Sequence, residues 1–318
     1  MISARQVQGA MAPQYRSASV SAIRPLASGM LNHVYRAQLS DPPCDIVVRE
    51  RHFTDPEYGQ FFAAERLAYP LLSRDRPRVP AFLGADESGT LSGNPLAVFG
   101  FIDGTRLDDL LEDRPSSRLL RALAIAIGHV HEVAAPGYGT LSATTHGPEE
   151  TGAFWKSLFE AEAATLARLY PASAENLRSR IPEWLARLRE APPGLVAPAL
   201  VHGDFHARNI IIDSTGEPNL IDWEAARFRS PGYDLVQILD LNLIRHKGVG
   251  TEFLSHYLAT RRISASPDEA MKIIDVFKRF WRIRMGGFMC LNDVPGCSYF
   301  GFQADYRRYL QEGGFLEF

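Results

Sequence analysis

The sequence predicts an α+β protein with two lobes, and three observations support this. Short apolar segments separated by turn residues fill the chain up to residue 101, which favours a small antiparallel sheet. Longer segments with apolar residues at helical spacing follow Gly104. Late in the chain, polar residues alternate with short apolar runs over residues 200–224, as in a hairpin. We therefore expect a lobe over residues 1–101 and a larger, mainly helical lobe over residues 102–318 that carries this hairpin.

The composition is that of a globular protein. The chain has 318 residues, of which 46% are hydrophobic and 22% are charged, enough for two substantial cores. A net charge of −3 gives no support for nucleic-acid binding, which calls for a basic face. Three cysteines without a Cys-x-x-Cys pair argue against a disulfide framework and favour buried thiols in a reducing compartment. Without an apolar signal segment or a helix long enough to cross a bilayer, we expect a cytoplasmic protein with no membrane partner.

The first lobe is predicted from short strands joined by turns. Residues 22–39 indicate strand, turn and strand, with Gly29 in the turn, where the backbone can approach a phosphate closely. A further strand follows over residues 44–50 and ends near Arg49. A helix then carries Glu65, and two more strands lead to Gly104. This order predicts a sheet interrupted by one helix.

The second lobe is predicted from helical periodicity. Thr105, followed three residues later by Asp108, indicates a helix N-cap with an acidic first turn. Ser266 followed by a proline and two acids indicates the start of a long helix. His129 and His131 lie near the end of an amphipathic helix, and we interpret both as structural residues. A last short helix is expected around residues 303–311.

The stretch 200–224 carries the polar residues on which the functional prediction depends. Asp204 follows His202, Asn209 comes five residues after Asp204 (209 − 204 = 5), and Asp222 thirteen after Asn209 (222 − 209 = 13). A short hairpin would bring the two acids and the amide to one rim of a cleft. One carboxylate can then accept or orient a hydroxyl proton, while the other and the amide supply the oxygen ligands that Mg²⁺ prefers. Phosphoryl transfer requires this division of labour.

Two alternatives explain these residues without such chemistry. In the first, the acids are incidental charges on a surface hairpin. In the second, His202 and His206, four residues apart, bind zinc. No cysteine or third histidine lies nearby, and His206 falls in a predicted loop, so the pattern disfavours a zinc site.

The stretch resembles the signature of the aminoglycoside phosphotransferase and choline kinase family, His-Gly-Asp-x-x-x-x-Asn followed by Ile-Asp-Trp. It differs from the protein-kinase pattern, because Gly203 replaces the arginine of His-Arg-Asp and Asp222-Trp223-Glu224 replaces Asp-Phe-Gly. The resemblance implies a two-lobed, protein-kinase-like fold. The loop at residues 136–148 and the tryptophan-containing helix after it are loosely similar to the hygromycin-type branch of the family.

The resemblance also implies a role for individual residues. Asp204 would be the catalytic base or hydroxyl-orienting group, and Asn209 and Asp222 would bind the metal. Arg49 would reach the nucleotide phosphates and pair with Glu65, although Glu50 and Glu57 are competing partners. The remaining implied residues are a phosphate loop of Ser28, Gly29 and Asn32, an adenine-binding backbone from Phe99 to Phe101, and structural support of the site by His202 and Asp234.

The function implied is Mg²⁺-dependent transfer of phosphate from ATP or GTP to a hydroxyl of a small molecule. Acceptors in the family include aminoglycosides and related antibiotics, choline, sugars and amino alcohols. A nucleotide-binding pseudokinase or regulatory protein is an alternative, and a protein kinase is a third. From Asp222 to Asp234 there are only twelve residues (234 − 222 = 12), which is too short for the usual peptide-binding segment.

The charge of the second lobe bears on the acceptor. Residues 230–318 contain ten acidic and eleven basic residues. A polycationic acceptor would call for an excess of carboxylates, because each desolvated ammonium needs a partner. We therefore predict an acceptor with at most one or two positive charges. Asp240, Asp293 and the terminal carboxylate of Phe318, which some relatives in the family use in this way, are the candidate acceptor ligands.

Overall fold

The structure is a computed structural model that describes residues 2–15, 17–28, 32–41, 43–52, 61–72, 77–243, 246–291 and 310–312. The chain divides into two compact units. Unit 1 comprises residues 1–106 and 209–225, and unit 2 comprises residues 107–208 and 226–318. Unit 1 is built mainly of antiparallel strands and unit 2 mainly of helices, which confirms the predicted α+β class.

Unit 1 contains eight strands and two α-helices among its described residues. In chain order they are α1 (Ala4–Ala10), β1 (Val20–Ser28), β2 (Asn32–Ser40), β3 (Pro43–Arg51), α2 (Phe61–Ala68), β4 (Phe82–Asp86), β5 (Leu96–Gly100), β6 (Gly104–Arg106), β10 (Ile210–Asp213) and β11 (Pro218–Leu220).

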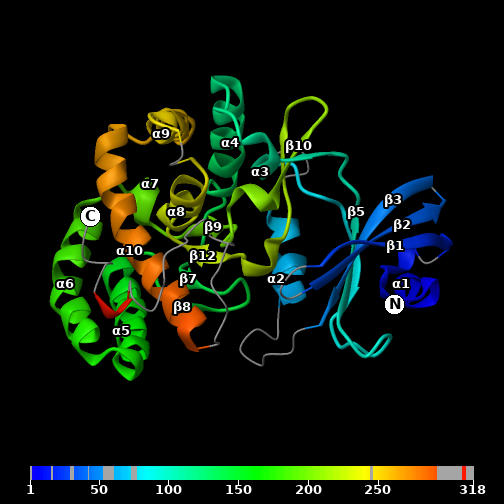
Figure 1. Ribbon diagram of the computed structural model, residues 1–318, viewed down its shortest axis with the longest axis horizontal. Coiled ribbons are helices and arrows are strands. Elements are labelled where there is room, and N and C mark those ends of the chain that lie inside the picture. The colour runs from blue at the N-terminus through cyan, green and yellow to red at the C-terminus, as the bar shows by residue number, and fades with distance from the viewer. Residues whose placement is uncertain are drawn as a thin grey trace. The chain divides into compact units, whose positions relative to one another are not determined.

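The larger sheet of unit 1 has the strand order β1-β2-β3-β5-β4, and every neighbouring pair is antiparallel (Figure 1). Helix α1 packs against β1, β4 and β5, and its first turn is closed by a capping box between Ser3 and Gln6. The core between helix and sheet includes Val7, Met11 and Ile46, all removed from solvent. Cys44, at the start of β3, is exposed, whereas the sequence suggested a buried thiol.

A second, three-stranded sheet in unit 1 has the order β11-β10-β6. Its outer strand, β6, contains Thr105, which pairs with Ile212, so the predicted helix cap at Thr105 is wrong. Gly104 is required in β6, because a Cβ atom there would lie 2.4 Å from the carbonyl oxygen of Ile212. This pairing attaches the hairpin of residues 209–225 to unit 1, whereas the predicted division at residue 101 placed the hairpin in the second lobe.

Unit 2 consists mainly of helices and also contains a small sheet. In chain order its elements are α3 (Leu107–Leu110), α4 (Ser117–Val130), β7 (Tyr138–Gly139), β8 (Thr144–His146), α5 (Thr151–Leu169), α6 (Pro171–Glu190), α7 (Pro193–Val196), β9 (Ala199–Val201), β12 (Arg227–Arg229), α8 (Gly232–Leu241), α9 (Val249–Thr260) and α10 (Pro267–Leu291).

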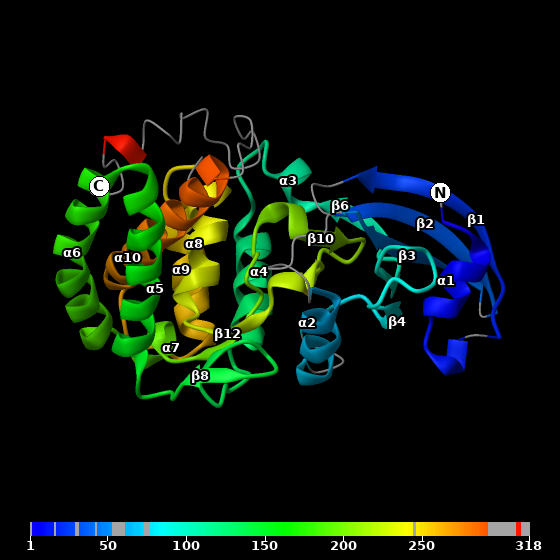
Figure 2. The ribbon, with the colours of Figure 1, turned by 90° about the horizontal axis from the view of Figure 1, so that it is seen from below.

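The helices of unit 2 pack on one another through apolar faces. Helices α5 and α6 lie side by side (Figure 2), and α10 contacts α5, α6, α8 and α9. At the centre, the ring of Trp155 lies 4.8 Å from that of Phe277 and 5.2 Å from that of Phe280, measured between centroids. Burial of aromatic rings at these distances contributes more than their area alone. The small sheet has the order β8-β7-β12-β9.

The start of α10 illustrates local sequence control. The hydroxyl of Ser266 accepts from the N–H of Glu269 at 3.2 Å, and the Glu269 carboxylate accepts from the N–H of Ser266 at 2.7 Å. This capping box begins the helix at the residue the sequence indicated.

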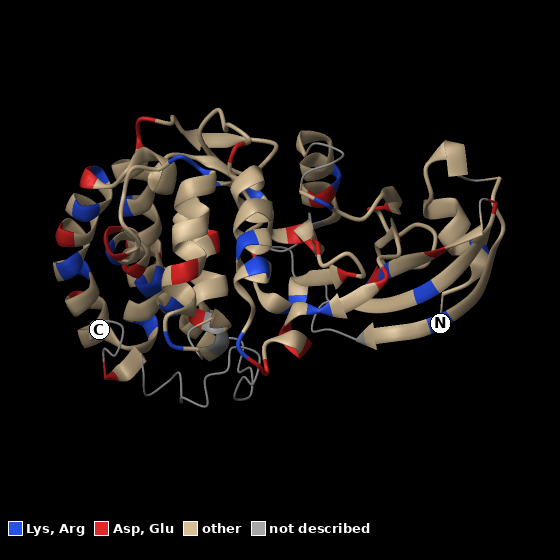
Figure 3. Cartoon of the chain, turned by 90° about the horizontal axis from the view of Figure 1, so that it is seen from above, with Lys and Arg blue, Asp and Glu red and all other residues tan. Residues whose placement is uncertain are grey.

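Basic and acidic residues are interspersed along the helices of unit 2 (Figure 3). Across the described part of the chain, no helix is long and apolar enough to cross a membrane.

Candidate functional site

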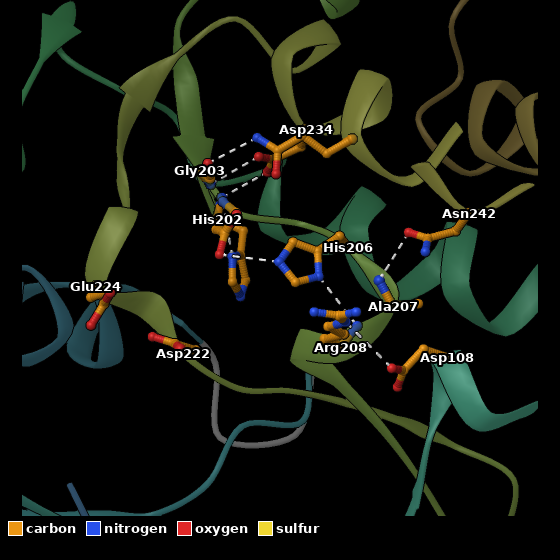
Figure 4. A network of polar contacts seen from close by, with 12 residues as sticks. Asp108, His202, Gly203, His206, Ala207, Arg208, Asp222, Glu224, Asp234 and Asn242 are labelled. Atoms are coloured by element: carbon orange, nitrogen blue, oxygen red, sulfur yellow. Dashed lines mark hydrogen bonds and ion pairs between the residues drawn. The ribbon is translucent and has the colours of Figure 1, made fainter. Parts of the chain in front are cut away.

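The loop after β9 carries His202, Gly203 and Asp204 and is held by helix α8 of unit 2 (Figure 4). The sequence predicted Asp234 as its anchor, and the two oxygens of that buried carboxylate accept the N–H groups of His202 at 2.7 Å and Gly203 at 2.8 Å. Gln237, one turn further on, donates to the carbonyl of Gly203 at 2.9 Å. Gly203 has a φ of 83°, a conformation that favours glycine. Helix α8 therefore holds the loop at both the N–H and the carbonyl group of Gly203.

Asp234 has a further partner in His131, the residue that follows the last residue of α4. Nε2 of His131 lies 3.2 Å from its carboxylate, and Nδ1 of His131 lies 2.8 Å from the hydroxyl of Tyr257 in α9. All three side chains are buried. Burial lowers the pKa of His131, and the carboxylate of Asp234 opposes this shift. In the neutral ring, Nε2–H donates to Asp234 and Nδ1 accepts from Tyr257, so α4, α8 and α9 hold the loop together.

The side chain of Asp204 is 36% exposed, so a ligand can reach it from solvent. Nε2 of His206 lies 3.3 Å from its Oδ2. The N–H of Asp204 donates to Nδ1 of His202 at 3.3 Å, and the N–H of Arg208 donates to Nδ1 of His206 at 3.2 Å. Both Nδ1 atoms are thus used by the backbone, which argues further against the zinc alternative. Sequence reasoning gave His206 no other role.

Asn209 and Asp222 lie at the same end of the hairpin in unit 1, where Asn209 is opposite Ile221, the residue before Asp222. Ile210 pairs with Leu220 in the β10–β11 ladder, and the N–H of Ile221 donates to the carbonyl of Asn209 at 3.0 Å. Asp222 has a φ of 67°, a left-handed conformation that costs a non-glycine residue about 1–2 kcal/mol. An amide and a carboxylate, both of which offer oxygen atoms as metal ligands, are therefore held at one edge of unit 1.

Arg49 connects this edge to helix α2. Its guanidinium donates to Glu65 at 2.7 Å, to Asp222 at 2.8 Å and to Glu224 at 2.5 Å. Glu65 also accepts the N–H of Trp223 at 3.0 Å. Of the alternative partners for Arg49 considered from the sequence, Glu50 bonds Tyr35 and Asn94 instead, and residue 57 lies outside the described residues.

The charges of this cluster are unequal, because three carboxylates share one hydrogen-bonded guanidinium. Burial raises the pKa of Glu65 to about 8, and the charge of Arg49 opposes the shift. Burial, together with the charge of Asp222, raises the pKa of Glu224 to about 7. Burial alone would lower the pKa of Arg49, but the three carboxylates outweigh it and raise the pKa. Arg49 therefore stays protonated, whereas the raised pKa values of Glu65 and Glu224 favour uptake of protons near neutral pH.

Glu224 is the member of this cluster that sequence reasoning missed. Its carboxylate accepts from the side chain of Asn32 at 3.1 Å as well as from Arg49. The sequence predicted Asn32 only as part of a phosphate loop. Ser28, at the end of β1, pairs with His33 across the hairpin, and Gly29 lies outside the described residues. The acid two places after Asp222 was the available signal for Glu224.

The predicted adenine-binding backbone lies at the end of β5. The N–H groups of Gly100 and Phe101 donate to the carbonyls of Ala81 at 2.8 Å and Asp45 at 3.1 Å. The N–H groups of Gly100 and Phe101 are therefore already used within the protein. The ring of Phe99 is buried in unit 1, and the ring of Phe101 packs under the guanidinium of Arg36 at 4.0 Å.

Asp240 was predicted to contact a cationic acceptor, and its charge is already matched. Arg282 donates to both of its oxygens, at 2.9 and 2.8 Å, and the ammonium of Lys278 lies 3.1 Å away. Asp240 borders a cavity of about 280 Å³ in unit 2. Asp234 and Asp240 are six residues apart in α8, so their side chains point in different directions. Asp234 faces the loop, and Asp240 does not. Asp293 and Phe318, the other acceptor candidates, lie outside the described residues.

Comparison with known sequences supports the resemblance. A model of the phosphotransferase enzyme family matches residues 22–270. Homoserine kinase of Methylobacterium sp. (strain 4-46) is 26% identical over 220 residues, which make up 68% of this chain and 62% of that relative. The chain thus aligns with less than two thirds of the length of this curated relative.

Comparison with solved structures supports the fold. The ADP-bound aminoglycoside phosphotransferase APH(2'')-Ib aligns with a TM-score of 0.65 and 16% identity over 98% of both chains. The apoenzyme of macrolide 2'-phosphotransferase MphH from Brachybacterium faecium aligns with a TM-score of 0.61 and 17% identity over 92% of this chain and 91% of that one. The predicted two-lobed, kinase-like fold is confirmed. Because the family model spans most of the chain, the protein belongs to the phosphotransferase enzyme family.

Proposed function

We propose that this protein transfers the γ-phosphate of ATP or GTP to a hydroxyl group of a small molecule. The observation that carries the proposal is the cluster in unit 1, in which Arg49 is held by Glu65 and contacts Asp222 beside Asn209. A protein needs a cation for phosphate oxygens and oxygen ligands for a metal ion in order to bind a nucleoside triphosphate. The cluster supplies both kinds of group at one edge of the unit.

Asn209 and Asp222 would hold Mg²⁺. Their donors are an amide oxygen and a carboxylate, the hard ligands that Mg²⁺ prefers, and the side chain of Asp222 is 32% exposed. Mg²⁺ in such sites uses one or two carboxylates and completes its shell with water and phosphate oxygens, so no larger cage is needed. In the part of the chain that the structure describes, no group of three or more His, Cys, Asp or Glu residues forms one. When bound, Mg²⁺ would offset the charge of the phosphate oxygens.

Asp204 would act on the acceptor. Its carboxylate would orient the acceptor hydroxyl and take its proton as the bond to phosphorus forms. The partly exposed side chain and the immobilised loop support this role, because a base that is held in place loses little entropy when the acceptor binds. Arg49 would contact the phosphates, which requires it to exchange part of its contact with Asp222 or Glu224 for phosphate oxygens.

The acceptor is proposed to be a small molecule with at most one or two positive charges. The carboxylate of Asp240 is neutralised by two basic side chains, and the acidic and basic residues of the region 230–318 are balanced. Similar proteins are named for homoserine, aminoglycosides and a macrolide, so an amino-acid or amino-alcohol acceptor is a reasonable first choice.

An acceptor panel tests the proposal. The purified protein is incubated with Mg²⁺ and either ATP or GTP, and with homoserine, choline, a hexose, a macrolide or kanamycin. Release of nucleoside diphosphate is measured, and ³¹P NMR detects a phosphate ester. We expect ester formation with at least one weakly charged acceptor. Nucleotide binding without acceptor-dependent release would favour the pseudokinase alternative, and efficient, salt-sensitive phosphorylation of kanamycin would overturn the predicted acceptor charge.

A further inference from the structure

His206 lies in the loop of unit 2 two residues after Asp204, and its side chain is 6% exposed. Burying an imidazole in a loop removes its hydration, so its two nitrogens need partners within the protein. One nitrogen has a backbone partner and the other faces Asp204. Neither the family signature nor the sequence pattern gave this residue a role in the reaction.

The backbone determines which nitrogen of His206 carries the proton. The N–H of Arg208 donates to Nδ1 at 3.2 Å, and a nitrogen that accepts a hydrogen bond has no proton of its own. The proton of the neutral ring is therefore on Nε2. Nε2 is the atom that lies 3.3 Å from Oδ2 of Asp204. The hydrogen bond accepted by Nδ1 thus sets the tautomer, and the tautomer places an N–H donor toward the carboxylate.

The segment that supports the ring is itself held in place (Figure 4). The N–H of Ala207 donates to the side-chain oxygen of Asn242, at the end of α8, at 3.0 Å. The guanidinium of Arg208 lies 3.6 Å from Asp108 in α3. The backbone on the C-terminal side of His206 is therefore tied to two helices of unit 2, which limits rotation of the ring away from Asp204.

We propose that His206 is a positioning residue for the reaction. Its Nε2–H holds Oδ2 of Asp204, so that Oδ1 is presented to the acceptor hydroxyl. In the step, the acceptor oxygen bonds to the γ-phosphorus, the bond to the β-phosphate oxygen breaks, and the hydroxyl proton moves to Oδ1. His206 neither gains nor loses a proton. This inference rests on the proposed function, because it assigns Asp204 the role of base.

Two substitutions separate the contributions of the two ring nitrogens. His206→Gln keeps an N–H donor near the position of Nε2, whereas His206→Asn keeps a polar group only near that of Nδ1. We expect His206→Gln to retain most of the turnover, within about threefold, and His206→Asn to lower kcat about tenfold with the nucleotide KM unchanged. His129→Asn, on α4 away from the loop, is the matched control and should leave both constants unchanged.

A spectroscopic measurement keeps the test independent of acceptor identity. The ¹³C resonance of the Asp204 carboxyl, assigned with Asp204→Asn, is followed against pH in aspartate-labelled protein. Because a donor favours the ionised carboxylate, the midpoint should move up by roughly one pH unit in His206→Asn and stay near that of the parent in His206→Gln. If no acceptor is phosphorylated, the proposed function fails, yet this titration still decides whether His206 acts on Asp204.

The contrary results are equally distinct. If His206→Gln and His206→Asn lose kcat equally, and the Asp204 carboxyl titrates with the same midpoint in both, His206 only supports the loop. Turnover unaffected in both variants would also overturn the proposal. A raised nucleotide KM with normal kcat would assign His206 to the nucleotide instead of Asp204.

Discussion

Units 1 and 2 each bury a charged network, and the two networks are balanced differently. In unit 2, the carboxylate of Asp234 receives two backbone N–H groups of the loop and a ring nitrogen of His131. In unit 1, the single guanidinium of Arg49 is shared by three carboxylates, two of which have raised pKa values. One network has a donor for each acceptor, whereas in the other three carboxylates share one bonded cation and would be in excess of it once all are ionised.

The difference between the two networks indicates different roles, one in positioning the loop and the other in binding a ligand. A buried carboxylate with all its donors in place fixes the loop and gains nothing further from a ligand. Excess buried negative charge is costly, and a bound cation would relieve that cost. We infer that the network of unit 2 sets the geometry of Asp204, and that the network of unit 1 couples its stability to metal and nucleotide. Removing the charge of a carboxylate should therefore destabilise the network of unit 2 and stabilise that of unit 1.

The largest expected effect is that of Asp234→Asn. The amide keeps the size of the side chain but supplies one oxygen where several N–H groups need acceptors. We expect the free energy of unfolding to fall by about 3–5 kcal/mol, because each buried N–H group left without an acceptor costs about 1–3 kcal/mol. Urea denaturation of the two proteins measures the difference. A loss below about 1 kcal/mol would mean that the loop does not depend on Asp234.

Arg49→Met should have the next largest effect. It preserves apolar contact with α2 but leaves three carboxylates without their bonded cation. We expect a loss of about 2–4 kcal/mol at pH 8 and a smaller loss near pH 5, where the carboxylates take up protons. Nucleotide affinity, measured by calorimetry, should fall about tenfold. Unchanged affinity would separate Arg49 from the phosphates.

Glu224→Gln should have the opposite sign. The folded-state pKa of Glu224, about 7, lies above its unfolded value of about 4.5, so the folded protein holds this proton more tightly between these pH values. The parent therefore loses stability as pH rises through that interval, and the glutamine variant does not. We expect the variant to be more stable by about 1–3 kcal/mol above pH 7, measured by denaturation at several pH values. A less stable variant would contradict the charge imbalance.

His131→Gln provides the smallest and most selective change. Burial lowers the pKa of His131, so the unfolded chain binds its proton first, and the parent loses stability as pH falls below about 6.5. The glutamine variant starts from a lower stability because it disturbs a buried contact, but its acid-side slope should be flatter than that of the parent. Parallel slopes between pH 6.5 and 5 would show that His131 is not held neutral.

The sequence and its family resemblance were informative over short stretches of chain. Asn209 and Asp222 flank one short hairpin, as the spacing predicted, and the pairing of Arg49 with Glu65, which the resemblance implied, spans only 16 residues of chain. They were not informative where distant segments meet. Glu224 reaches Arg49 across 175 residues, a separation that no local pattern spans.

One wrong prediction and one contact that was not foreseen have the same origin. Thr105 has the local pattern of a helix cap, but pairing of β6 with β10 competes with that pattern and prevails. His131 meets Asp234 across 103 residues, so its role in holding the loop could not be read from one amphipathic helix. Long-range pairing overrides local preference in these places.

The central claim is that Asp204 serves the acceptor while unit 1 binds the nucleotide, and one comparison tests it directly. Turnover and nucleotide affinity are measured for the parent, for Asp204→Ala and, as a reference for the metal ligands, for Asp222→Asn. We predict that Asp204→Ala lowers turnover by roughly 10²-fold or more and leaves nucleotide affinity within about a factor of two, whereas Asp222→Asn raises the Mg²⁺ requirement. Retained turnover in Asp204→Ala would contradict the account.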